Sequence, residues 1–290
     1  MSAKVKRARE AMRERCDSIA AGCQEKQMPR VVALYRYPVK SFTPESCTTL
    51  QILPEGRVAG DRVLGFRFAN APFPDEAWSR KYEFVALVNT PALARLALRF
   101  DDRALRLRIS NGDAVLADEG LDRGGRARLA AAVAEYALAQ EENPLAGHPE
   151  RLPLRLVGDG VSPRYQDNET GQITLHSRES LAAVAGAANE ARLSELRFRS
   201  NVVIEGVPAW EEQSWLGKTL RIGDVLFDVA RPKVRCLATH ANPATGIRDV
   251  PLMPILVQSF RQQEPTFGVG MLTRGAGGAI RLGDTCHIAD

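Results

Sequence analysis

Short runs of alternating apolar and polar residues, interrupted by Gly and Pro, dominate the chain and predict many short β-strands. The clearest hairpin spans 105–117, where two apolar-rich runs flank Ser110-Asn111-Gly112-Asp113. Asn-Gly accepts the positive φ angles of a type I′ turn, so we expect that turn here. Other strands are expected at residues 31–37, 48–53, 63–68, 84–88, 152–157, 173–176, 201–204, 220–229 with a bend at Gly223-Asp224, 279–282 and 285–288.

Helical composition is confined to fewer segments. Thr90-Pro91 has a capping residue followed by proline, which predicts a helix running to Leu98. Further helices are expected at residues 4–27, which carry Cys16 and Cys23 on one face, and at 127–140, 178–188 and 254–262. Many strands with few helices predict a β-rich α+β fold, built as two β-barrel-like domains with peripheral helices.

A chain of 290 residues is long enough for two hydrophobic cores. The segment 141–149 is polar and interrupted by Pro and Gly, so we place a domain boundary there. The expected division is an N-terminal helical extension at 1–29, a first barrel-like domain at 30–148 and a second at 149–290.

Composition narrows the functional classes. No apolar run reaches the roughly 18 residues of a membrane helix, and the basic N-terminus lacks the apolar core of a secretory signal, so a cytoplasmic location is expected. Five cysteines, an odd and scattered set, are read as reduced. The net charge of +4 suits an anionic ligand, but dispersed arginines give little support for nucleic-acid binding.

Chemistry concentrates in residues 231–249, around Cys236. Arg231, Lys233 and Arg235 precede the thiol, and nearby positive charge favours the thiolate, which is a nucleophile and a soft-metal ligand. The turn residues 242–246 place the cysteine at a strand end or in a loop. Zinc bound by Cys236 with His240 is an open alternative, although no second ligand pair is visible.

Basic residues also follow or precede several predicted strands, at Lys40-Ser41, Arg80-Lys81 and Arg197–Asn201. If these loops converge, their cations and hydroxyls would form a site for a phosphate or another oxyanion. No Walker A loop, Rossmann glycine fingerprint or Ser-His-Asp order is present, which disfavours the common nucleotide-binding and hydrolase classes.

Several motifs of the chain, in their order, resemble those of MOSC domain proteins that have an N-terminal MOSC β-barrel domain, in the branch of the mitochondrial amidoxime-reducing components. The resemblance covers nearly all of residues 30–290. The motifs are Tyr37-Pro38-Val39-Lys40-Ser41, Gly60-Asp61-Arg62, Phe198-Arg199-Ser200-Asn201, the Arg235-Cys236 loop, Phe267-Gly268 and Gly283-Asp284.

This resemblance implies an oxidoreductase that binds the molybdenum cofactor (Mo-molybdopterin) and reduces N-hydroxylated compounds by oxygen-atom transfer. Cys236 would be the metal ligand and the catalytic residue. A separate ferredoxin-like or cytochrome b5-like protein would supply electrons, because the chain ends at Asp290 directly after the MOSC domain. The residues implied to bind the cofactor are Lys40, Ser41, Arg80, Ser177, Arg199, Asn201 and Arg235.

The chain departs from the family at Val234, His240, Asn242 and Ala244, which bears on the substrate pocket more than on the metal ligand. A second hypothesis is therefore a carrier protein, in which Cys236 holds persulfide sulfur or the cofactor is only stored. A third, a nucleic-acid-binding barrel, would predict salt-sensitive binding to DNA or RNA, which we do not expect.

Overall fold

The computed structural model of the chain describes residues 28–289. The helix expected over 4–27, together with Cys16 and Cys23, lies outside the described residues. The part described is β-rich, with three α-helices and several 3₁₀ turns, so the β-rich α+β class is confirmed.

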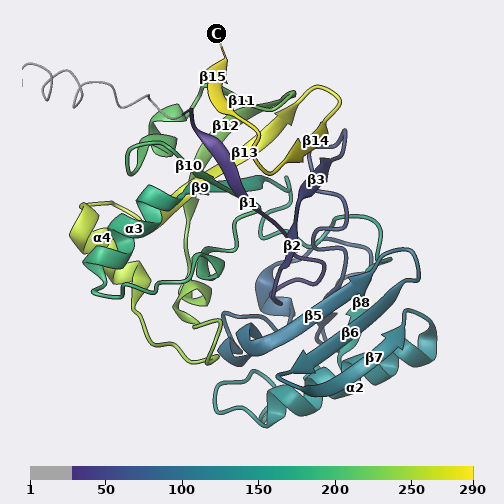
Figure 1. The fold of residues 1–290 in the computed structure, drawn as a ribbon. Coiled ribbons are helices and arrows are strands. Elements are labelled where there is room, and N and C mark those ends of the chain that lie inside the picture. The colour runs from purple at the N-terminus through teal and green to yellow at the C-terminus, as the bar shows by residue number, and fades with distance from the viewer. Residues whose placement is uncertain (1–27, 290) are drawn as a thin grey trace, which may run out of the picture.

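An eight-stranded sheet forms the upper half of the molecule (Figure 1), in the order β15-β11-β12-β13-β9-β10-β1-β2. Neighbouring strands are antiparallel except for the parallel pair β9 and β10. The strands are β1 (Arg30–Arg36), β2 (Glu45–Cys47), β9 (Ile173–Ser177), β10 (Val202–Glu205), β11 (Thr219–Ile222), β12 (Val225–Val234), β13 (Thr266–Arg274) and β15 (Cys286–Ala289).

The expected barrel is formed only in part. Within residues 28–289, β15 and β2 are the two ends of an open ladder, and no continuous pairing closes it into a ring. A single bridge between Arg30 and Thr285, with Val31 N donating to Asp284 O at 2.9 Å, brings the start of β1 next to the start of β15. The sheet therefore curls strongly without closing, as twisted strands do.

A second layer lies at the lower right of Figure 1, where α2 covers one face of the three-stranded sheet β5-β6-β7. Helix α2 begins directly after Asp122, whose side chain accepts hydrogen bonds from Gly124 N and Gly125 N and so caps the helix. The elements here are β5 (Leu96–Asp101), β6 (Arg106–Asn111), β7 (Ala114–Gly120) and α2 (Arg123–Leu138), with the small pairs β4 (Gly65–Arg67) with β8 (Arg155–Val157) and β3 (Thr49–Ile52) with β14 (Gly278–Arg281).

Helices α3 (Arg178–Ala187) and α4 (Leu252–Phe260) lie together at one flank of the large sheet (Figure 1). Leu252 and Leu256 of α4 pack with Val184 of α3 in a small apolar core. The 3₁₀ helices are η1 (Lys81–Glu83), η2 (Pro91–Arg95), η3 (Pro149–Arg151), η4 (Glu195–Phe198), η5 (Glu211–Trp215) and η6 (Leu237–His240).

Two local predictions were wrong. The helix expected from Thr90 to Leu98 is only the 3₁₀ turn η2, because the alternating pattern from Leu96 onward continues as β5 with every second side chain buried. The strand expected at 84–88 is a single bridge at Phe84 followed by a turn.

The predicted hairpin is confirmed, but its turn differs. Asn111 pairs with Ala114, which leaves Gly112 and Asp113 in the loop, and of these two only Gly112 has a positive φ, 58°. A glycine at the first loop position is the type II′ arrangement rather than the type I′ expected from Asn-Gly.

Strand β13 was not predicted, because its glycines obscure the strand pattern. Gly268 has a φ of +68°, and a Cβ there would lie 2.3 Å from Leu175 O on the neighbouring β9. Only glycine permits this approach, so the residue that hides the strand in the sequence is required by the packing.

Strands β1 and β3 come before residue 148 but pair with β10 and β14, which come after it. The larger apolar cores are correspondingly two: one lies under β5–β7 and α2, and the other lies between the curled strands of the large sheet. The division at residue 148 stays a prediction. Among the helices of residues 28–289, none combines the length and hydropathy needed to cross a bilayer.

Candidate functional site

Cys236 lies just beyond the end of β12, where the chain leaves the sheet. Arg235 N still bonds across to Pro265 O at 2.7 Å, and η6 begins directly after Cys236. The carbonyl of Cys236 accepts hydrogen bonds from Thr239 N and Thr239 Oγ1, both at 3.0 Å. The expectation that the cysteine follows a strand is confirmed, and its half-buried side chain is fixed by a short turn.

Three neighbouring cavities meet at Cys236 and Asp167. We call them the inner cavity (about 60 Å³), the side cavity (about 30 Å³) and the open cavity (about 310 Å³). The inner cavity includes Arg62, Gln172, Thr174, Phe198, Arg199 and Arg235; the side cavity includes Lys40, Ser41, Lys81, Ala86, Leu87 and Val88; the open cavity includes Lys81, Asn168, Arg231, Pro232, Lys233 and Val234.

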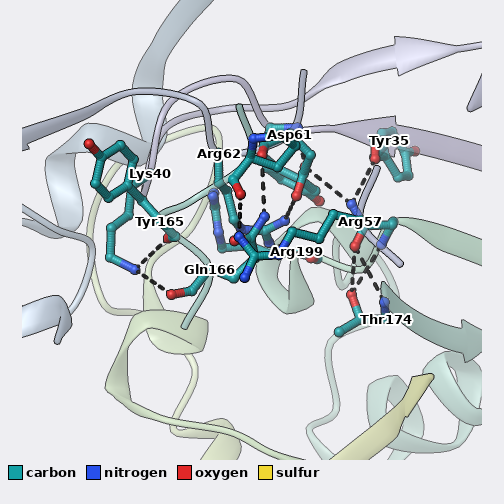
Figure 2. A network of polar contacts seen from close by, with 12 residues as sticks. Tyr35, Lys40, Arg57, Asp61, Arg62, Tyr165, Gln166, Thr174 and Arg199 are labelled. Atoms are coloured by element: carbon teal, nitrogen blue, oxygen red, sulfur yellow. Dashed lines mark hydrogen bonds and ion pairs between the residues drawn. The ribbon is translucent and has the colours of Figure 1, made fainter. Parts of the chain in front are cut away.

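A buried ion pair supports the wall between the inner and side cavities. Asp61 accepts a hydrogen bond from Arg62 and another from Tyr37 N at 2.8 Å. Arg62 Nη2 also donates to Arg199 O at 3.4 Å, and Figure 2 shows the two arginines side by side below Asp61. Arg199 lies over the Tyr37 ring, 4.3 Å from its centroid. This packing holds both guanidinium groups at the cavity wall.

Lys40 is 2 % exposed and is held by three oxygen acceptors. Its Nζ donates to Tyr165 O at 2.8 Å, to Gln166 O at 3.4 Å and to Asp167 Oδ1 at 3.3 Å (Figure 2 shows the two carbonyl contacts). Burial lowers the pKa of Lys40, and the charge of Asp167 opposes that shift. Neighbouring Ser41 has a left-handed φ of 70° and lines the side cavity.

Asp167 is the one carboxylate that lines all three cavities, and its side chain is 58 % exposed. Burial alone would raise the pKa of Asp167, but the charges of Lys40 and Lys233 outweigh burial and hold this pKa well below its usual range. Its negative charge is already committed to these cations, so the site keeps an excess of positive charge.

The lowered pKa values of the cations reflect this excess of positive charge. Burial lowers the pKa of Arg199 and of Arg235 to about 10, and burial lowers the pKa of Lys233 to about 8, with further lowering from Arg235 and Arg62. Crowded, poorly solvated cations are stabilised when an anion binds among them. The electrostatics therefore favour an anionic ligand.

Lys81, rather than Arg80, reaches the site. Arg80 is exposed, whereas the next residue, Lys81, begins η1 and lines both the side and the open cavity. Burial lowers the pKa of Lys81, but the charge of Cys236 and a hydrogen bond with its side chain outweigh burial, so this pKa is raised.

Two other residues implied to bind cofactor are used inside the fold. Ser177 Oγ caps α3 and donates to buried Glu212 at 3.1 Å. Asn201 accepts hydrogen bonds from Thr174 and donates to Asp61 Oδ1 at 3.2 Å. Lys40, Ser41, Arg199, Arg235 and Cys236 are brought together at the cavities; Arg80, Ser177 and Asn201 are not among the residues that line the cavities described above.

The site also contains residues that sequence reasoning did not single out as ligands. Arg62 lay in a quoted motif, Asp167 lay in a polar loop, and Lys81 was adjacent to Arg80, but no periodicity pointed to them. His240 does not face a metal partner: its Nε2 accepts a hydrogen bond from Met253 N at 3.1 Å. In the described part of the chain, no three His, Cys, Asp or Glu residues are grouped as a metal site.

Comparison with protein families bears on the same residues. A family model described as MOSC domain matches residues 162–287. The chain carries a MOSC domain. This domain contains Asp167, Arg199, Lys233 and Cys236, while Lys40 and Lys81 reach the site from the preceding part of the chain.

Curated relatives of the chain fall into two groups. It is 29% identical over 146 residues to human mitochondrial amidoxime-reducing component 1, covering 46% of this chain and 42% of that protein. It is 36% identical over 73 residues to molybdenum cofactor sulfurase of Caenorhabditis briggsae, covering 25% of this chain and 10% of that protein. The MOSC-containing chain thus spans less than half the length of these relatives.

Among solved structures, the YuaD protein from Bacillus subtilis aligns over 90% of this chain and 94% of that one. The identity is 11% and the TM-score 0.40, which is too low for an argument about fold or function.

The depressed pKa of Lys233 predicts a pH-dependent stability. Folded Lys233 has a pKa of about 8 against about 10.5 for an unfolded lysine, so the unfolded chain binds more protons between these values. Lys233 therefore makes the free energy of unfolding rise as the pH increases from 8 to 10.5. We expect Lys233→Met to be more stable than the wild type at pH 7, by at most about 3 kcal/mol.

Urea unfolding at pH 7, 8.5 and 10 measures this difference. Exposed Lys218, which lines none of the described cavities, supplies the control Lys218→Met. A wild-type advantage over Lys233→Met at pH 7 would contradict the prediction.

Proposed function

We propose that this chain is an oxidoreductase that binds the molybdenum cofactor and reduces N-hydroxylated compounds by oxygen-atom transfer. Cys236 is the metal ligand, and electrons come from a separate ferredoxin-like or cytochrome b5-like protein. One observation carries the proposal: a half-buried thiol and several crowded cations line the same neighbouring cavities.

The charges of the residues that line the cavities fit the molybdenum cofactor. The pKa values of Arg199 and Arg235 are lowered by burial and by the charge of Arg62, so the phosphate of a phosphorylated pterin would offset this repulsion. Lys40 and Ser41 line the side cavity together with Arg199. These four residues of the expected set would hold the cofactor, with Arg62, Lys81 and Asp167 beside them.

The metal donor that the chain offers, the Cys236 thiolate, also fits the molybdenum cofactor. A thiolate is a soft ligand, and within residues 28–289 no group of three or more His, Cys, Asp or Glu residues is placed to hold a metal ion. A metal at Cys236 would therefore take its other ligands from the cofactor. When bound, the cofactor supplies the two-electron redox chemistry that accepts an oxygen atom.

The chain's own residues orient the sulfur of Cys236. Thr239 fixes the turn that presents the sulfur, and Lys81 places a positive charge beside it. Reduction of an N-hydroxylated substrate breaks its N–O bond, consumes two electrons and two protons, and releases water. The open cavity gives a substrate of small-molecule size a path to Cys236, because its volume lies within the usual range of ligand pockets.

The similarity to amidoxime-reducing components supports this reaction over the carrier alternative. The similarity to molybdenum cofactor sulfurase supports a cofactor-related role in either case. The two hypotheses differ in turnover: an oxidoreductase converts substrate, whereas a carrier or storage protein does not.

Metal analysis and an activity assay test the proposal. The chain is purified from a host that makes the molybdenum cofactor, and its molybdenum content is measured by mass spectrometry. Benzamidoxime is then supplied with a chemically reduced artificial donor. We expect near-stoichiometric molybdenum and formation of benzamidine. Bound molybdenum without turnover would favour the storage alternative. The absence of both molybdenum and turnover would refute both hypotheses.

A further inference from the structure

In the part of the chain that the structure describes, three cations line the open cavity without forming an ion pair within 4 Å. Lys81, Arg231 and Lys233 all line it, and none of the ion pairs formed within residues 28–289 includes any of them. Some exposed arginines of this chain do form ion pairs: Arg106 pairs with Asp118 at 2.7 Å and Arg274 with Asp228 at 3.1 Å. Three cations without an ion pair among the described residues thus lie together at the entrance to Cys236.

Arg231 is held in place at this entrance. Its Nε donates to Gln172 Oε1 at 2.9 Å, and the residue itself is exposed in the second half of β12. The hydrogen bond directs one edge of the guanidinium to the wall. The opposite edge, with its remaining donors, is free for a ligand in the cavity.

Asp167, the carboxylate of the open cavity, offsets only part of this charge, because it is one negative charge among four lining cations. It lies 3.3 Å from Lys40 Nζ on the far side, and Lys40 is itself almost fully buried. The cations near the cofactor differ from those at the entrance, since Arg62 is paired with Asp61, and Arg199 and Arg235 donate to backbone carbonyls. Arg62, Arg199 and Arg235 therefore have donors committed to partners within the fold.

We propose that the open cavity selects N-hydroxylated substrates that carry a carboxylate or another oxyanion, which Arg231 binds with the help of Lys81 and Lys233. This inference rests on the proposed function and specifies its substrate class. A cavity lined by one sign of charge concentrates ligands of the opposite sign, and a guanidinium binds a carboxylate through two parallel hydrogen bonds. Salt should weaken this preference, because the entrance is open to solvent.

A charge series of amidoximes tests the inference. The kcat/KM is measured for neutral benzamidoxime, for its 4-carboxylate and for its 4-aminomethyl analogue, at low and high salt. We expect the carboxylate to be preferred over the neutral compound by about tenfold at low salt, and the cationic analogue to be the poorest. High salt should reduce the preference.

Arg231→Gln separates substrate binding from cofactor binding. We expect the variant to lose most of the preference for the carboxylate, with the rate for benzamidoxime and the molybdenum content unchanged. Arg274→Gln is the matched control, because Arg274 is an exposed arginine of the neighbouring β13 and lines none of the described cavities.

The outcomes are distinct. Equal kcat/KM for the three compounds in an active wild-type protein would overturn the inference and leave the proposed function standing. A fall in molybdenum content in Arg231→Gln would assign the arginine to the cofactor and also overturn it. Failure of benzamidoxime and of both analogues to react would refute the proposed function itself.

Discussion

Cys236→Ser is expected to abolish molybdenum binding and to reduce amidoxime turnover by at least a hundredfold. A serine hydroxyl stays protonated at neutral pH and is a poorer ligand for a metal that prefers a thiolate. The backbone around position 236 keeps its bonds to Thr239, so the variant should fold normally. Mass spectrometry of the bound metal and steady-state rates measure the two effects.

Cys47→Ser is the control for this experiment. Cys47 is also half-buried and free, but it lies in β2 and lines none of the cavities around Cys236. The control should keep its metal and its activity. Molybdenum retained at wild-type levels in Cys236→Ser, with the thermal midpoint unchanged, would show that the sulfur is not the ligand.

Asp61→Ala is expected to destabilise the fold by about 3–5 kcal/mol, because it leaves the buried Arg62 without its counter-charge. Asp61 also accepts hydrogen bonds from Tyr37 N and Asn201 Nδ2, which would lose their acceptor. Asn201 belongs to the segment that carries Arg199, so the cavity wall should loosen as well. Equilibrium unfolding in urea measures the loss.

Asp118→Ala provides the comparison. Asp118 pairs with Arg106 at 2.7 Å on the exposed face of β6 and β7, where ion pairs contribute about 1 kcal/mol or less. A similar loss of unfolding free energy in Asp61→Ala and Asp118→Ala would contradict the larger stabilisation assigned to the buried pair of Asp61 and Arg62.

The position of Cys236 could be predicted because the signals were local. The cations before the thiol indicated its chemistry, and the Pro-Gly turn after it indicated a strand end. In the structure, Cys236 lies at the end of β12. The choice between Arg80 and Lys81 could not be predicted in this way. Adjacent side chains point in different directions, and the 3₁₀ turn η1 decides which of them faces Cys236.

Other residues depend on contacts between distant segments. The resemblance implies that Asn201 binds the cofactor; in the fold its amide is hydrogen-bonded to Thr174 and Asp61, which lie 27 and 140 positions away. Strand β13 was missed because Gly268 is required by a neighbouring backbone oxygen, a demand that no propensity reveals. Such features follow from packing rather than from the order of residues.

The pairing of β1 with β10 has a consequence for biosynthesis. Arg30 and Glu205 of these strands are separated by 175 positions, so β1 emerges from the ribosome long before its partner. Until β10 has been translated, the edge of β1 that pairs with it presents unpaired amides and carbonyls, to which chaperones or other nascent chains can bind. Slowing translation would lengthen this interval and lower the yield of native protein.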